Sequence, residues 1–294
     1  MNPSEWVQTA HNLETYCQGF FAGAGNCSLF YQRWLPAIQL QAVLVIVHGL
    51  GGHSGWHSII ATHFVPRQYG VYTFDLRGHG RSPGLRGHIN HWSEFRADLE
   101  CFVQFVQQEH PHIPIVAVGH SLGGTILLDY VLHHPQVLQG IIVTAPAIGA
   151  VAISPVKLAL GRLLSRIWPQ FSLSTGFDLT CSTRDPDVLA AYQQDPLRHR
   201  LGTARLSTEF QQAVNRIQSQ AASLQVPILL LHGTADCVVP ISGSRQFFDH
   251  LTLAQKVKRE YTGAYHDLYN DLSRDQVLTD IEDWLTQRVP RTGD

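Results

Sequence analysis

Short runs of apolar, often β-branched residues recur along this chain and alternate with longer amphipathic stretches. Continuous apolar runs of this length are typical of strands that are buried on both faces. Their alternation with helical stretches predicts βαβ units, and therefore an α/β fold around a mostly parallel sheet flanked by helices. The runs are residues 42–47, 71–75, 115–119, 140–144 and 227–231.

Apolar residues spaced by three and four predict helices over residues 92–108 and 276–288. Ser93 is placed to cap the first of these helices. In the first forty residues, glycines stand between aromatic clusters, which predicts an N-terminal hairpin.

One connection is far longer than the rest, because the 77 residues from 149 to 225 separate two predicted strands. Connections between a helix and a strand usually take about 2–6 residues. We therefore expect a helical cap inserted over 149–225, with the core formed by 1–148 and 226–294. Residues 154–168 and 206–224 have the spacing of helices within the cap.

The charge composition bears on partners and on compartment. A formal net charge of −2, with 15% charged residues, argues against nucleic-acid binding, which needs clustered basic charge. The five cysteines are scattered and form no Cys-x-x-Cys pair, so we expect neither a disulfide framework nor a zinc site. No signal peptide or membrane-spanning run is read from the sequence. A cytoplasmic location follows as the expectation.

Residues 119–123 read Gly-His-Ser-Leu-Gly and lie between a predicted strand and a predicted helix. A serine on so sharp a turn is exposed at the start of the helix, and the flanking glycines remove side chains that would clash there. The pattern predicts Ser121 as a nucleophile. A glycine-rich turn with an incidental serine is the alternative.

A serine nucleophile needs a base and an orienting carboxylate. Among seventeen histidines we favour His266, in a loop before the last helix, and we favour Asp236 because it follows a strand directly. The order Ser121, Asp236, His266 is the one that this arrangement requires. Asp267 is expected to cap a helix or to face solvent, because neighbouring side chains rarely converge. Cys237, next to Asp236, is expected to be a small buried residue.

The negative charge that develops on a substrate carbonyl needs N–H donors. We expect these donors to be the backbone N–H groups of Leu122, directly after the serine, and of Leu50, in the glycine-rich loop 48–52. Glycines allow that loop to approach the site closely. A loop of this kind can also bind phosphate.

Several motifs occur together in this chain: residues 48–50, 74–82, 84–88, 119–124, 195–197 and 232–236, and His266. Together they resemble the α/β-hydrolases of the monoacylglycerol lipase and lysophospholipase group, which is serine aminopeptidase S33-like. The resemblance implies hydrolysis of long-chain monoacylglycerol or lysophospholipid esters beneath a mobile cap, with no cofactor and no metal. The sequence departs from the animal lipases at Gly52, where they usually carry Glu, and at Trp56 and His57, where they carry Arg-Tyr.

The sequence therefore predicts a serine carboxylester hydrolase that cleaves single-chain acyl esters through an acyl-enzyme. Alternatives on the same fold are a small-ester esterase, a peptidase, and a lipid sensor without turnover. An apolar arc over residues 153–168 is expected to cover the pocket or to pack on neighbouring cap helices. Transient contact with a membrane surface, which would make the protein peripheral, is the other interpretation of this arc.

Overall fold

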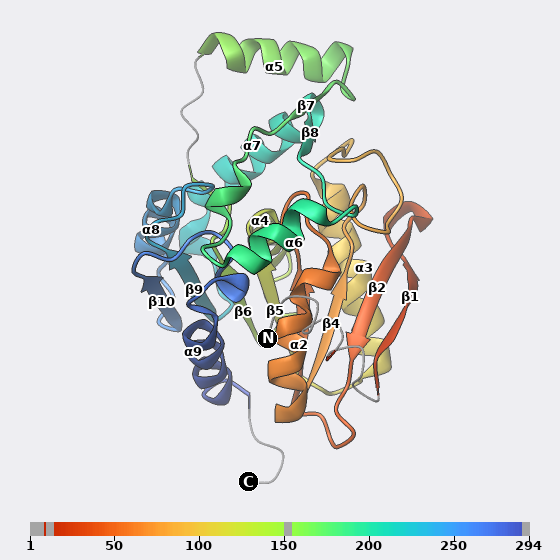
Figure 1. Cartoon of the computed structure of the whole chain (residues 1–294), viewed down its shortest axis with the longest axis vertical. Coiled ribbons are helices and arrows are strands. Elements are labelled where there is room, and N and C mark those ends of the chain that lie inside the picture. The colour runs from red at the N-terminus through yellow and green to blue at the C-terminus, as the bar shows by residue number, and fades with distance from the viewer. Residues whose placement is uncertain (1–8, 10–14, 150–154, 290–294) are drawn as a thin grey trace.

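The computed structural model describes residue 9, residues 15–149 and residues 155–289 (Figure 1). The first residues of the chain, in which no signal peptide is predicted, lie largely outside this part. In the expected apolar arc, Ile153 and the side chains of Val156, Lys157 and Leu160 also lie outside it. Eight strands of the described residues form the main sheet, in the order β1-β2-β4-β3-β5-β6-β9-β10. They are β1 (Cys17–Ala22), β2 (Ser28–Trp34), β3 (Ala42–Val47), β4 (Tyr69–Phe74), β5 (Ile115–His120), β6 (Gly140–Thr144), β9 (Ile228–Gly233) and β10 (Lys256–Tyr261).

The sheet is parallel except at one edge. Strands β1 and β2 form an antiparallel hairpin, and β2 pairs with β4 in the antiparallel direction. Every other pairing is parallel. The predicted N-terminal hairpin and the mostly parallel sheet are confirmed.

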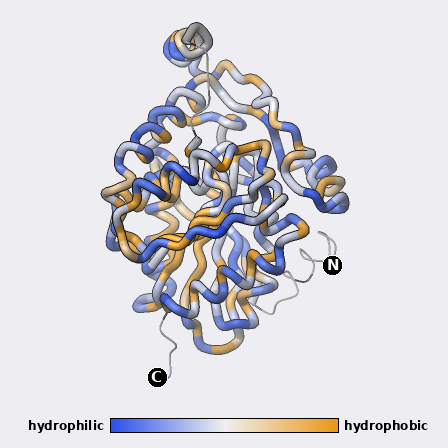
Figure 2. The backbone as a smooth tube through the Cα atoms, turned by 90° about the vertical axis from the view of Figure 1, so that its left-hand side faces the viewer, coloured by the Kyte–Doolittle hydropathy of each residue, from blue (hydrophilic) through white to orange (hydrophobic). Residues whose placement is uncertain are grey.

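Both faces of the sheet are buried under helices, as the continuous apolar runs predict. In β3, for example, Val43, Val45 and Val47 join one apolar cluster, and Ala42, Leu44 and Ile46 join the other. Figure 2 shows hydrophobic segments running through the middle of the molecule. One face is covered by α3 (Ser93–Glu109), α4 (Leu122–His133), α7 (Ala204–Ser219) and α8 (Ile241–His250), and the other by α2 (Ser58–Phe64) and α9 (Arg274–Thr286).

The elements between β6 and β9 include a second, two-stranded sheet and three helices. In Figure 1, α5, β7 and β8 stand at the upper end of the molecule, and α7 leads from them toward the body. Helix α7 packs against both α5 and α4. These elements are α5 (Pro155–Ile167), β7 (Ser172–Ser174), η4 (Leu179–Cys181), α6 (Pro186–Gln194), β8 (Leu201–Thr203), α7 and η5 (Ala221–Ser223).

Helix α3 begins differently from the prediction. Ser93 is its first residue, and no side-chain hydrogen bond caps this end. Instead, the Glu94 carboxylate accepts a hydrogen bond from the N–H of Asn90 at 2.7 Å. The expected Ser93 cap was wrong, because an acidic residue in the first turn satisfies the preceding backbone in its place.

Candidate active site

Ser121 occupies the turn between β5 and α4 in a strained conformation. Its φ is 53° and its ψ is −118°, a region that a residue with a side chain rarely adopts. A Cβ on Gly123 would lie 2.1 Å from the carbonyl oxygen of Val47, and one on Gly119 would lie 2.7 Å from that of Gly123. The predicted steric need for both glycines is confirmed.

The structure brings Ser121, His266 and Asp236 together from loops that are far apart in the sequence. Nε2 of His266 lies 2.9 Å from Oγ of Ser121, and its Nδ1 lies 2.7 Å from Oδ2 of Asp236. The three residues follow β5, β10 and β9, at the carboxyl ends of parallel strands, where open α/β sheets place their sites. Serine, imidazole and carboxylate therefore form one continuous chain of hydrogen bonds.

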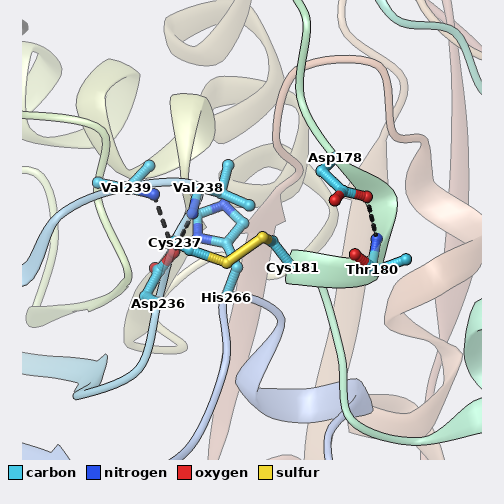
Figure 3. The surroundings of a disulfide bond; sticks show 8 residues. All are labelled: Asp178, Thr180, Cys181, Asp236, Cys237, Val238, Val239 and His266. Carbon is cyan, nitrogen blue, oxygen red and sulfur yellow. Dashed lines mark hydrogen bonds and ion pairs between the residues drawn. A yellow bond between two sulfur atoms is a disulfide. The ribbon is translucent and has the colours of Figure 1, made fainter.

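The Asp236 carboxylate is almost completely buried, with 1% of its side chain exposed. Its Oδ1 accepts hydrogen bonds from the N–H groups of Val238 and Val239, both at 2.8 Å (Figure 3). Nε2 of His232 approaches Oδ2 at 3.1 Å. Burial opposes ionisation, but the hydrogen bonds from His232 and His266 outweigh it and hold the pKa of Asp236 well below its ordinary value.

The same carboxylate shifts the pKa of His266 in the opposite direction. Burial would lower the pKa of the imidazole, but the hydrogen bond and the charge of Asp236 raise it above its ordinary value. A buried imidazole that is oriented by an ionised carboxylate and hydrogen-bonded to a hydroxyl can take up the hydroxyl proton. The arrangement is chemically equipped for attack by serine on an ester carbonyl.

His232 is a further partner of the Asp236 carboxylate that the sequence pattern did not predict. Its Nδ1 lies 2.8 Å from Oγ of Ser244, so the ring is fixed on both sides. His232 and Asp236 frame the strand-end motif 232–236, and this spacing was the signal that could have identified His232 as a partner of the carboxylate.

The predicted oxyanion donors lie beside Ser121. Leu122 is the first residue of α4, where a backbone N–H has no acceptor within its own helix. Leu50 lines the two cavities that Ser121 also lines. In the described part of the chain, no protein acceptor takes the N–H of Leu50.

Asp267 does not face solvent, contrary to the expectation from its position next to His266. Its Oδ1 lies 2.6 Å from Nε2 of His120, and its Oδ2 accepts a hydrogen bond from the hydroxyl of Tyr192 at 2.6 Å. Burial would raise the pKa of Asp267, but the charge and hydrogen bond of His120 lower it below its ordinary value. The side chain is buried and close to His266, but it pairs with a different histidine, His120.

His120, His266 and Asp267 are also a group whose ligand atoms lie within 4.8 Å of one another, close enough to hold a metal ion. Each of these atoms already has a protein partner, however. Nε2 of His120 pairs with Asp267, and Nε2 of His266 with Ser121. We therefore treat these residues as parts of two hydrogen-bonded pairs.

Two cavities meet at Ser121 and Leu50. The larger, of about 510 Å³, has no charged residue in its described lining. It lies between the core and the elements that follow β6, and its wall includes Leu164, Phe171, Leu206 and Phe210. The smaller, of about 80 Å³, is lined mainly by polar side chains, including His120, Tyr192 and Arg198.

Asp195 contacts two residues that line the smaller cavity, His53 and Trp56. Oδ2 of Asp195 accepts a hydrogen bond from Nε1 of Trp56 at 2.6 Å and lies 2.7 Å from Nε2 of His53. Despite burial, these contacts lower the pKa of Asp195 to about 2. His57, which like Gly52 and Trp56 departs from the animal lipases, is buried, and burial lowers its pKa to about 3.

A disulfide joins Cys181 to Cys237, although the sequence indicated no disulfide framework (Figure 3). Cys237 is exposed, so the expectation that it is a small buried residue was also wrong. Cys181 ends η4, and Cys237 directly follows Asp236. The scattered spacing concealed this pair, because 56 residues of sequence separate two cysteines that the fold brings together. Because disulfides are rare in the reducing cytosol, the disulfide removes the support that the cysteine pattern gave to the expected cytoplasmic location. Cys17, Cys27 and Cys101 are free.

The apolar arc of α5 divides between two surroundings. Leu164 lines the larger cavity, whereas Leu163, Ile167 and Trp168 have between 53% and 70% of their surface exposed. No helix in the described residues has the combination of length and apolar character that crossing a bilayer requires.

Comparison with known proteins gives consistent matches over most of the chain. Residues 38–273 match the family model described as serine aminopeptidase, S33. The chain is 32% identical to a monoacylglycerol lipase of Mycolicibacterium smegmatis, over 92% of this chain and 96% of that protein. It is 26% identical to the phospholipase YtpA of Bacillus subtilis, over 81% of this chain and 92% of that protein.

A crystal structure of a monoacylglycerol lipase from Paleococcus ferrophilus is similar throughout. Its TM-score is 0.81 at 31% identity, and the match covers 88% of this chain and 99% of that chain. Fold, family model and relatives agree with one another. The chain belongs to the serine aminopeptidase S33 family, has the α/β-hydrolase fold and is a serine ester hydrolase.

Proposed function

We propose that this enzyme hydrolyses the ester of a single long acyl chain, as in a monoacylglycerol or a lysophospholipid. Ser121 attacks the ester carbonyl while His266 takes its proton, and Asp236 orients the imidazole. His266 then returns the proton to the leaving alcohol, and water releases the acyl chain from Ser121 by the same route. The N–H groups of Leu50 and Leu122 stabilise the oxyanion of each tetrahedral intermediate.

The observation that carries this proposal is the position of Ser121 between two cavities of opposite character. The larger cavity, with its uncharged lining, suits an acyl chain, since each buried methylene contributes about 0.8 kcal/mol. The smaller cavity suits a polar alcohol. An ester that spans the two has its carbonyl at the nucleophile. The names of the relatives, monoacylglycerol lipase and phospholipase, agree with such a substrate.

We further propose that residues 149–225 act as a cap that admits the acyl chain and rests on lipid surfaces. Leu163, Ile167 and Trp168 expose apolar surface on or directly after α5, and Leu173 of β7 adds to it. Exposed apolar side chains on an amphipathic helix can insert into the boundary region of a membrane. Such contact would make the enzyme peripheral to the membrane.

The central experiment compares the wild type with Ser121→Ala on esters of increasing acyl length and on aminoacyl substrates. We expect the variant to lose at least about 99% of turnover while its thermal unfolding stays close to that of the wild type. A fluorophosphonate should label the wild type at Ser121 and leave the variant unlabelled. Labelling at another residue, or retained activity in the variant, would contradict the covalent mechanism.

Acyl length separates this proposal from the small-ester alternative. Wild-type kcat/KM should increase over several carbons of acyl chain and level off once the larger cavity is full. A preference for acetate over decanoate esters would refute the long-chain assignment and leave only an esterase.

Membrane contact has a separate test in Leu163→Ser combined with Ile167→Ser. The double variant should lose activity on substrate presented in vesicles and keep it on soluble monomers of the same ester. Equal losses on both forms would argue against a membrane-facing role.

A further inference from the structure

The positively charged side chain of Arg198 lies in the wall of the smaller cavity. It follows α6 and the Asp195 turn, and its guanidinium stacks on the ring of Tyr192, 3.9 Å from the ring centroid. The guanidinium carbon of Arg198 also lies 5.8 Å from the centroid of a Trp56 ring. Stacking of this kind holds the guanidinium plane in place without using its N–H donors.

No carboxylate in the described residues forms an ion pair with Arg198, although the charge of Arg198 contributes to the lowered pKa of Asp267. The two nearby carboxylates have other partners. Asp195 contacts His53 and Trp56. Asp267 contacts His120 and Tyr192. Within the described residues, the guanidinium makes neither an ion pair nor a hydrogen bond. Its donors are therefore available to a ligand.

The charge around Ser121 is distributed unevenly. The described lining of the larger cavity contains no charged side chain, whereas the smaller one has Arg198 and Arg200 against the single carboxylate of Asp267. An ester bound at Ser121 with its chain in the larger cavity places its alcohol portion beside Arg198. The planar fork of a guanidinium matches the oxygens of a phosphate better than the hydroxyls of a neutral glycerol.

We propose that Arg198 binds a phosphate on the alcohol portion of the substrate, so that the preferred ester is a lysophospholipid with an accessible anionic phosphate. The inference rests on the proposed hydrolysis of single-chain esters at Ser121. It narrows the substrate class by the head group and leaves the chemistry at the ester unchanged.

The test compares lysophosphatidic acid with monoacylglycerol of the same acyl chain, both in neutral detergent micelles, as substrates of the full-length protein. The wild type should prefer the phosphate-bearing ester by at least about 10-fold in kcat/KM. Arg198→Gln should reduce this preference by about 10- to 100-fold, mainly through KM, because a charge-assisted hydrogen bond is lost. Arg198→Lys should restore part of it, since a lysine keeps the charge and loses the fork.

Arg166→Gln is the matched control, because Arg166 is an exposed arginine of α5 that lines neither cavity. It removes the same charge and should leave the preference unchanged. The rate of fluorophosphonate labelling of Arg198→Gln shows whether its Ser121 site is still assembled.

The outcomes separate this inference from the function on which it depends. Hydrolysis of monoacylglycerol that requires Ser121, with no preference for the phosphate or with equal effects of Arg198→Gln on both substrates, would overturn the inference alone. Hydrolysis of neither lipid by a wild type that is labelled at Ser121 would overturn the proposed function instead.

Discussion

At the scale of single residues, two carboxylates lie close to the catalytic histidine. Asp236 and Asp267 are both buried and both lie close to the imidazole of His266, but only Asp236 is hydrogen-bonded to it. Asp267 is paired with His120. The electrostatic consequence is that the basicity of His266 depends on Asp236 first and on Asp267 second.

This difference leads to a prediction for Asp236→Asn. The amide cannot hold the imidazole in the same tautomer, so we expect kcat/KM to fall by about 10³- to 10⁴-fold. Asp267→Asn is the matched substitution at the neighbouring residue and should cost far less. Steady-state kinetics on one soluble ester measure both variants. Comparable losses would mean that Asp267 also orients His266.

The pH dependence follows from the raised pKa of His266. The imidazole must be neutral to accept the serine proton, and a raised pKa keeps it protonated to a higher pH. The acid limb of kcat/KM should therefore have its midpoint above the ordinary histidine value of about 6.5 and should move to lower pH in Asp236→Asn. A midpoint well below pH 5 would indicate that a carboxylate is the base.

At the scale of elements, α5 presents neighbouring leucines to different surroundings. Leu164 lines the larger cavity, whereas Leu163 is 53% exposed. Leu164→Trp should fill part of the cavity, so that kcat/KM stops increasing at a shorter acyl length and short esters react as in the wild type. Leu163→Trp adds the same side chain one residue away and should leave this profile on soluble esters unchanged. If the two variants give the same profile, α5 does not line the acyl path.

The elements also show where sequence reasoning succeeds and where it ends. The strands before Ser121 and Asp236 were predicted within about two residues, because apolar runs buried on both faces leave a clear pattern. The position of each residue at a strand end then followed from the parallel order. The proximity of Ser121, Asp236 and His266 was thus predictable from local sequence and one topological rule.

The missed features depend on how one segment folds back onto another. The inward turn of Asp267 requires His120, which lies on a strand far away in the sequence. The pairing of Cys181 with Cys237 requires η4 to lie against the loop after β9. The division of α5 into a cavity face and an exposed face depends on where α7 lies. The spacing of apolar residues within a single segment does not predict such long-range contacts.

At the scale of the whole molecule, the disulfide links stability to redox state. It joins residues 56 positions apart, and in the loop-closure model such a crosslink stabilises a protein by about 4 kcal/mol. We expect Cys181→Ser, or reduction of the wild type, to lower the melting temperature by several degrees. Cys101→Ser removes a free cysteine and is the control. An unchanged melting temperature on reduction would show that the crosslink contributes little to the folded state.

The same bond turns part of the linear chain into a covalent ring that runs from Cys181 to Cys237. Arg200 is exposed within this ring, whereas Arg166 is exposed outside it. A protease that cuts once after Arg166 would yield two polypeptides that separate on a denaturing gel without reductant. A single cut after Arg200 would leave the pieces tethered through sulfur, and they would separate only after a thiol is added. A nick in this ring would therefore leave the chain in one covalent piece, and one at Arg166 would divide it.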